Sequence, residues 1–188
     1  MSNDQIQIPL LGIRTATSPG SPVDSPGGSG MYVFEYFESH VDLEDVDGLR
    51  SYSGNVCILY PPGQRTLFKA GKHSNHTWFY LQGDGLSECL ERYSIPTFRA
   101  IVGLLDPSTL ITFLESVRRH SVQQEIFWEN AVTVLSRTFF RNLSRSIAQG
   151  AHLDKQSVYQ RENLNTLRHV RGEVYAEQDL HTEPGWPL

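Results

Sequence analysis

Two stretches, GNVCILYPPGQ at residues 54–64 and HTWFYLQG at residues 76–83, decide the fold expected for this chain. The first is a short apolar run of strand-forming residues. Its Pro-Pro-Gly end predicts a stop, because proline cannot donate to a ladder of hydrogen bonds and glycine favours a turn. The second is rich in aromatic residues, which favour strands. Both stretches therefore predict short β-strands, with a polar turn between them.

Similar strands are expected before and between these stretches. Residues 31–37 (MYVFEYF) and 41–46 alternate between apolar and polar positions, and Asp47-Gly48 is a strong signal for a hairpin turn. Residues 66–68 form a further short apolar run. Strands spaced by about 8–12 residues, with turns between them, are typical of an antiparallel barrel or sandwich.

The second half of the chain changes to helical spacing. Asp106 and Pro107 supply an N-cap and a proline at the first helical position, and the apolar spacing predicts a helix to residue 120. A longer helix is expected over residues 123–149, before Gly150. The order of strands followed by helices predicts an α+β fold.

Composition and charge narrow the functional classes. The chain has 188 residues and a formal net charge of −5, which disfavours a free-standing nucleic-acid-binding domain because such domains usually carry a basic surplus. Cys57 and Cys89 match neither a disulfide framework nor a metal ribbon. The sequence shows neither a membrane-spanning run nor a signal-peptide pattern, so we expect a cytoplasmic protein with no membrane partner.

One predicted strand carries the candidate binding residues. Because successive side chains of a strand point to opposite faces, His76, Trp78 and Tyr80 lie on one face. If this face points into the barrel, the imidazole and indole rings can hydrogen-bond to a small polar molecule and stack on it, and Phe68 adds a second aromatic wall. The alternative is that Trp78 simply belongs to the core.

A metal site is the weaker alternative. His73 and His76 have HxxH spacing and His40 lies on an earlier strand, so a metal-dependent enzyme is conceivable. These three histidines are not clustered in the sequence as the ligands of metal-binding small barrels are. The alternative is that they are solvated side chains that bind no metal. The sequence also lacks a GxSxG motif, a phosphate-binding loop and a dinucleotide fingerprint. We therefore expect neither an enzyme nor a cofactor.

Residues 54–64 and 76–83 resemble the sensor domain of AraC-type bacterial transcription regulators. In that family a strand reads Gly-Asp, four apolar residues and Pro-Pro-Gly, and Asn55 here replaces the Asp. The resemblance implies a cupin-like β-barrel that binds a small effector, a sugar being one such ligand. It also implies an N-terminal arm able to cover the pocket and an antiparallel two-helix hairpin through which two subunits form a homodimer.

The resemblance also assigns roles to residues. His76 and Trp78 fall where sugar-binding sensors of the family place a histidine and a tryptophan, and Phe68 falls where they have a tyrosine. The residues that match the dimer contact are Ile126, Phe127 and Asn130.

The resemblance predicts four segments. They are an N-terminal arm with a flexible Ser/Pro/Gly segment at 1–30, a cupin-like barrel at 31–105, a helical dimerisation segment at 106–150, and a linker with a helix at 151–188. The last helix is similar to the first helix of the family's DNA-binding domain, so we expect the chain to contact DNA only through a helix-turn-helix domain that continues beyond it.

Three hypotheses follow. The first is the effector-sensing and dimerising region of an AraC-type regulator. The second is a small metal-dependent cupin enzyme, and the third is a barrel that dimerises without binding an effector.

Overall fold

The computed structural model describes residues 4–16, 22–71, 74–103, 105–123 and 127–150. The chain divides into two compact units, Met1–Ile147 and Ala148–Leu188, and the fold described below is that of the first. The linker and helix expected over residues 151–188 lie outside the described residues.

Within the described residues, nine strands form two antiparallel sheets, and helices complete an α+β unit. The strands are β1 (Leu11–Ala16), β2 (Val23–Ser25), β3 (Tyr32–Phe37), β4 (Val41–Asp45), β5 (Gly48–Tyr52), β6 (Val56–Tyr60), β7 (Thr66–Ala70), β8 (Asn75–Leu81) and β9 (Ile101–Val102). The five-stranded sheet has the order β1-β8-β3-β6-β9, and the four-stranded sheet has the order β2-β7-β4-β5. This architecture confirms the expected α+β class and agrees with a cupin-like barrel followed by helices.

The strands predicted between residues 31 and 81 are present as β3 to β8. The turn expected at Asp47-Gly48 joins β4 to β5. Val46 and Asp47 form its loop, and Gly48, the first residue of β5, has a positive φ of 98°, a conformation that favours glycine. The run closed by Pro-Pro-Gly is β6, which lies between β3 and β9 inside the larger sheet. Its burial on both faces explains its continuous apolar sequence.

The sheets begin before residue 31, which differs from the expectation of an arm over residues 1–30. Strand β1 pairs with β8, and β2 pairs with β7. The Ser/Pro/Gly composition of this segment does not favour a strand locally, so β2 forms through contacts with residues distant in the sequence. Among these contacts, Arg65 donates two hydrogen bonds to the carboxylate of Asp24, at 2.9 and 2.8 Å. The remaining domain boundaries stay predictions.

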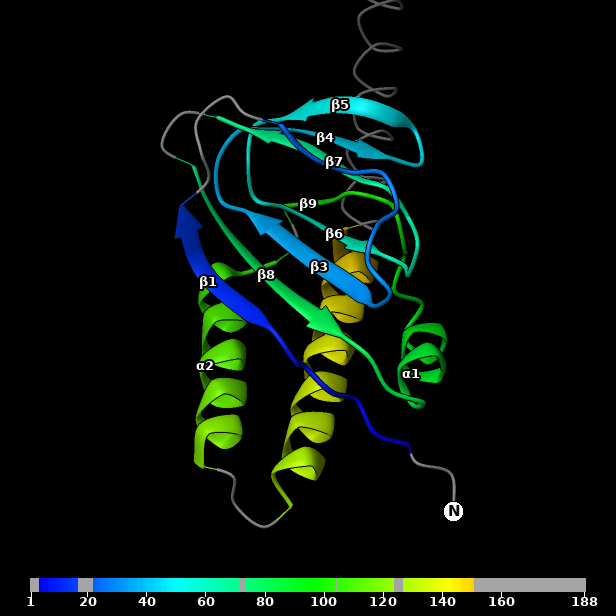
Figure 1. The fold of residues 1–188 in the computed structure, drawn as a ribbon, viewed down its shortest axis with the longest axis vertical. Coiled ribbons are helices and arrows are strands. Elements are labelled where there is room, and N and C mark those ends of the chain that lie inside the picture. The colour runs from blue at the N-terminus through cyan, green and yellow to red at the C-terminus, as the bar shows by residue number, and fades with distance from the viewer. Residues whose placement is uncertain (1–3, 17–21, 72–73, 104, 124–126, 151–188) are drawn as a thin grey trace, which may run out of the picture. The chain divides into compact units, whose positions relative to one another are not determined.

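Helices cover the larger sheet on the side away from the smaller one (Figure 1). Helix α1 (Leu86–Arg92) follows β8 and was not predicted, whereas α2 (Pro107–Gln123) begins at the predicted proline. A further helix runs from residue 128 to residue 150. Asp106 caps α2, since its Oδ2 accepts the backbone N–H of Thr109 at 3.2 Å. Helix α2 and the helix at 128–150 run antiparallel to each other, as expected (Figure 1).

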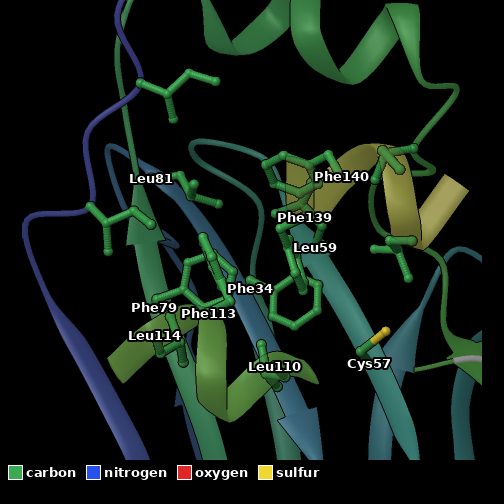
Figure 2. Packing of buried hydrophobic residues seen from close by; sticks show 14 of the residues in the cluster. Phe34, Cys57, Leu59, Phe79, Leu81, Leu110, Phe113, Leu114, Phe139 and Phe140 are labelled. Atoms are coloured by element: carbon green, nitrogen blue, oxygen red, sulfur yellow. The ribbon is translucent and has the colours of Figure 1, made fainter. Parts of the chain in front are cut away.

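Aromatic rings fill the space between the larger sheet and this helix pair. Phe34 of β3 stacks on Phe79 of β8 at 4.8 Å, and Phe113 of α2 stacks on Phe139 of the following helix at 4.6 Å. Figure 2 shows these rings converging with aliphatic side chains from both layers. Offset ring pairs of this kind each contribute about 0.5–1.5 kcal/mol beyond the burial of their surface.

The first described residues cross from the sheet to the helix at 128–150. Ile6 is fully buried, and its backbone N–H donates to Oγ1 of Thr133 at 3.0 Å. Asp4 forms an ion pair with Arg137 of the same helix. Because β1 follows directly, this N-terminal segment connects the edge of the larger sheet to the helix.

Candidate functional site

Strand β8 turns three side chains toward the smaller sheet. Thr77, Phe79 and Leu81 are buried on the helix side, while His76, Trp78 and Tyr80 alternate with them and are partly exposed. The residues expected on one face therefore do share it. We call this side of the larger sheet the inter-sheet face.

His76 lies between two phenylalanine rings on this face. Its ring is 5.6 Å from Phe37 of β3, nearly parallel at 14°, and 5.6 Å from Phe68 of β7. Burial lowers the pKa of His76, an effect partly offset by the nearby backbone of Thr15. A neutral imidazole is therefore favoured, and its buried Nδ1 makes no hydrogen bond to the described residues. Phe68 therefore lies beside His76, and its role as a wall of a binding site stays a prediction.

Glu35 is the residue that the sequence analysis missed. It lies on β3 between Val33 and Phe37, which both belong to the cluster between the sheets, and it is directly opposite Trp78 in the β3–β8 register. Glu35 is 7% exposed, and burial raises the pKa of its carboxyl to about 8. The folded protein therefore favours a protonated, uncharged Glu35 at neutral pH.

The carboxyl of Glu35 lacks a strong partner. Its Oε2 lies 3.5 Å from Nε2 of His76, and it accepts no hydrogen bond from the described residues. Within the described part of the chain, neither Lys nor Arg forms an ion pair with it. A buried polar atom left in this state costs about 1–3 kcal/mol, so the unused oxygen needs an explanation.

Tyr60 adds a second unused group from the neighbouring strand. It is 1% exposed on β6, its register partner on β3 is Val33, and its hydroxyl makes no hydrogen bond within the described residues. Burial and the nearby carboxyl of Glu35 raise the pKa of Tyr60, so the hydroxyl stays protonated. Three adjacent strands of the described chain thus each place on the inter-sheet face one buried polar atom that makes no hydrogen bond: Oε2 of Glu35, the hydroxyl of Tyr60 and Nδ1 of His76.

Trp78 closes the side of this face next to β1. Its indole Nε1 donates to Oγ1 of Thr15 at 2.9 Å, and its ring packs edge-on against Tyr80 at 5.6 Å. Gly12 lies opposite Trp78 in the β1–β8 register, and a Cβ built there would lie 2.5 Å from Nε1. Strand β1 therefore needs glycine at this position for the indole to lie across it.

The opposite wall comes from the smaller sheet and is mainly apolar. Val41 and Leu43 of β4 are fully buried and join Phe68 in the cluster between the sheets. Asp45, at the end of β4, already accepts hydrogen bonds from the Tyr52 hydroxyl and the Ala100 backbone. The polar atoms between the sheets that make no hydrogen bond, those of Glu35, Tyr60 and His76, therefore lie on the larger sheet.

The histidines of the metal hypothesis are not brought together by the described residues. The side chain of His40 is 55% exposed and lies 3.5 Å from Asp42, whereas the side chain of His76 is 12% exposed and lies on the inter-sheet face. His73 lies outside the described residues. Within the part of the chain that the structure describes, no three His, Cys, Asp or Glu side chains are grouped to hold a metal ion.

The residues expected at a dimer contact lie at the start of the helix at 128–150. Phe127 is 74% exposed and Asn130 is also exposed, while Ile126 lies outside the described residues. A surface groove of about 350 Å³ is lined here by Gln5, Phe127, Trp128, Glu129 and Asn130. These observations describe an accessible face and leave the dimer contact a prediction.

The comparisons with known proteins give a fold neighbour and no sequence relative. Neither the family models nor the curated proteins match this sequence. Among solved structures, the chain resembles an apo variant of ToxT from Vibrio cholerae, an AraC-family regulator, with a TM-score of 0.50 and 11% identity. The match covers 78% of this chain and 58% of the ToxT chain. At this identity the likeness shows a shared fold and nothing more. Separately, no helix in the described residues has the length and apolarity needed to cross a membrane.

Proposed function

We propose that this chain is the effector-sensing and dimerising region of an AraC-type transcription regulator, which binds a small polar molecule between the two sheets. The observation that carries the proposal is a set of three buried polar atoms on one aromatic face that make no hydrogen bond within the described residues: Oε2 of Glu35, the hydroxyl of Tyr60 and Nδ1 of His76. Binding sites in proteins typically combine apolar walls with a few polar groups of this kind. The fold likeness to ToxT supports a regulator in preference to an enzyme.

The proposed signal follows connected contacts from the ligand site to the helices. A ligand beside Trp78 would bear on the hydrogen bond from its indole to Thr15, on β1. The chain just before β1 is bonded to the helix at 128–150 through Ile6 and Thr133. A ligand that favours one position of β1 would thereby favour one arrangement of the helix pair.

Ligand screening tests the binding part of this proposal. Thermal shift of the full chain would be measured against sugars, amines and carboxylic acids, and we expect at least one class to raise the melting temperature. The shift should disappear in Trp78→Leu and persist in Trp128→Leu, since Trp128 packs against the helix-side core. The proposal fails if no compound stabilises the protein, or if a stabilising compound acts equally on both variants.

Exposed apolar side chains near the turn of the helix pair support the dimerisation part. Val122, Phe127 and Val134 are 77%, 74% and 62% exposed, respectively. A second copy of the chain would remove these side chains from water, and Ile126 and Asn130 belong to the same proposed contact.

The dimer is tested by light scattering on the double variant Phe127→Asp and Val134→Asp. We expect a dimer in the unchanged protein and a monomer in the variant. Leu49→Asp is the matched control, because Leu49 is 63% exposed on β5 and lies outside the helix pair. A monomeric unchanged protein would refute this part.

DNA recognition belongs to the proposal only for an intact regulator that includes a helix-turn-helix domain. We expect the 188 residues alone to give no sequence-specific shift of DNA in a gel. A cytoplasmic location follows from the same proposal, because a bacterial regulator acts on DNA there.

A further inference from the structure

The chemistry of the inter-sheet face is that of a carboxyl surrounded by aromatic rings. Glu35 is flanked across the strand pairing by Trp78, and the neighbouring positions on this face hold the stacked rings of Phe37 and His76. Phe68 from the smaller sheet completes the aromatic surroundings. The faces of such rings carry partial negative charge.

No basic side chain among the described residues balances Glu35 apart from His76, whose Nε2 is 3.5 Å from the carboxyl. Burial disfavours the charged form of this imidazole. The face therefore combines an acidic group without a cation and rings that attract cations.

We propose that the occupant of this face is a small organic ammonium ion, for which Glu35 is the counter-ion and the surrounding aromatic rings are the walls. The inference rests on the proposed function, since it names the ligand class of the same site. The ammonium group would donate to Oε2 of Glu35 and to the hydroxyl oxygen of Tyr60, which make no hydrogen bond within the described residues. An anionic ligand would meet the carboxyl and the ring faces, which both repel it.

A neutral polyol is the competing ligand class. It could use the same hydrogen-bonding atoms, but it would leave the acidic group and the electron-rich rings without a positive charge. A polyol site also needs many polar partners, and the smaller sheet contributes apolar side chains at Val41, Leu43 and Phe68. The observations therefore favour the ammonium ion.

Binding of an ammonium ion would release a proton. The neutral carboxyl of Glu35 would lose its proton to the solvent, and the resulting carboxylate would pair with the cation, so charge and atoms balance. The other titratable groups that face this region are His76 and Tyr80 from β8, Tyr60 from β6, and the hydrogen-bonded pair of Asp45 and Tyr52 from the smaller sheet. Release of one proton makes the affinity rise close to tenfold for each pH unit while Glu35 is protonated in the free protein.

Calorimetry on the full chain tests the inference with three ammonium ions: methylammonium, putrescine and benzylammonium. Benzyl alcohol is the neutral match for benzylammonium, and L-arabinose represents the polyols. Each titration at pH 7 would be repeated in two buffers with different heats of ionisation, which measures the protons released. We expect at least one ammonium ion to bind with release of about one proton, and benzylammonium to bind at least tenfold tighter than benzyl alcohol.

The variant Glu35→Gln keeps the shape of the side chain and removes its charge. We expect it to weaken ammonium binding at least tenfold and to abolish proton release, while Glu44→Gln, which changes an outward-facing position of β4, behaves like the unchanged protein. A normal circular dichroism spectrum would show that Glu35→Gln is folded. If that variant does not fold, the buffer comparison and the alcohol comparison on the unchanged protein decide the inference.

The outcomes separate the ligand class from the proposed function. Equal binding of alcohol and amine, or failure of all three amines to bind, overturns the ammonium inference. L-arabinose binding that is lost in Trp78→Leu overturns it as well, but leaves an effector site between the sheets. If neither the broad screen above nor this panel yields a ligand that depends on Trp78, the proposed function itself falls.

Discussion

Replacing Glu35 by glutamine should make the ligand-free protein more stable, by an amount that grows with pH. In the unfolded chain the carboxyl ionises above pH 4.5, whereas in the folded protein burial holds its pKa at about 8. The stability contributed by the buried neutral carboxyl is therefore complete below pH 4.5 and is lost as the pH rises toward 8. Each pH unit in this window costs about 1.4 kcal/mol.

The size of the effect follows from that window. At pH 7.5 the protein is three pH units above the unfolded pKa of 4.5, so the cost to the unchanged protein is about 4 kcal/mol. Glutamine is uncharged in both states and avoids this cost. The difference in unfolding free energy between Glu35→Gln and the unchanged protein should rise by that amount between pH 4.5 and pH 7.5.

Urea unfolding followed by circular dichroism at pH 4.5, 6 and 7.5 measures this difference. The lowered pKa of His76 acts in the opposite direction, since its contribution is present above pH 6.5 and is lost as the pH falls through the folded pKa. His76 is common to both proteins, so the part of its contribution that does not depend on contact with Glu35 cancels in the comparison. A difference that stays constant with pH would refute the reasoning that burial keeps this carboxyl neutral. Glu44→Gln, at a partly exposed position of β4, is the control.

Two further predictions concern packing. Gly12→Val should displace the indole of Trp78, because the added Cβ would lie 2.5 Å from its Nε1, and we expect altered tryptophan fluorescence and a loss of about 1–3 kcal/mol. Gly30→Ala, where an added Cβ meets no atom within 4 Å, is its control, and equal spectra for the two variants would contradict the prediction. Phe113→Ala removes a buried ring stacked on Phe139 at 4.6 Å and should cost about 3–5 kcal/mol in urea unfolding. A cost under about 1 kcal/mol would mean that this aromatic core is not packed as described.

The fold was predictable where the sequence carries local signals. The alternation over residues 31–37 matches strand β3. The Asp47-Gly48 signal matches the turn between β4 and β5, and the Pro-Pro-Gly sequence matches the end of β6. Strand β2 was not predictable, because Val23–Ser25 is exposed at every position and forms only through its pairing with β7. Helix α1 is one short element of seven residues without a side-chain cap, which leaves little pattern to detect.

Part of the candidate site was also predictable. The shared face of His76, Trp78 and Tyr80 follows from the period of a strand, although their role in binding remains a prediction. Glu35 could have been found by the same rule, since it is the one charged residue in the run MYVFEYF and shares a face with Val33. The absence of a hydrogen bond to its Oε2 could not have been predicted, because it depends on which strands lie beside β3.

The contacts of the N-terminal segment also affect the order in which the protein can fold during synthesis. Ile6 bonds to Thr133, and Thr15 bonds to Trp78, so residues made first must wait for partners made 127 and 63 positions later. Such distant pairings slow folding and leave strands unpaired while the chain emerges from the ribosome. Until the helix at 128–150 has been made, the segment before β1 lacks its hydrogen bond from Ile6 to Thr133.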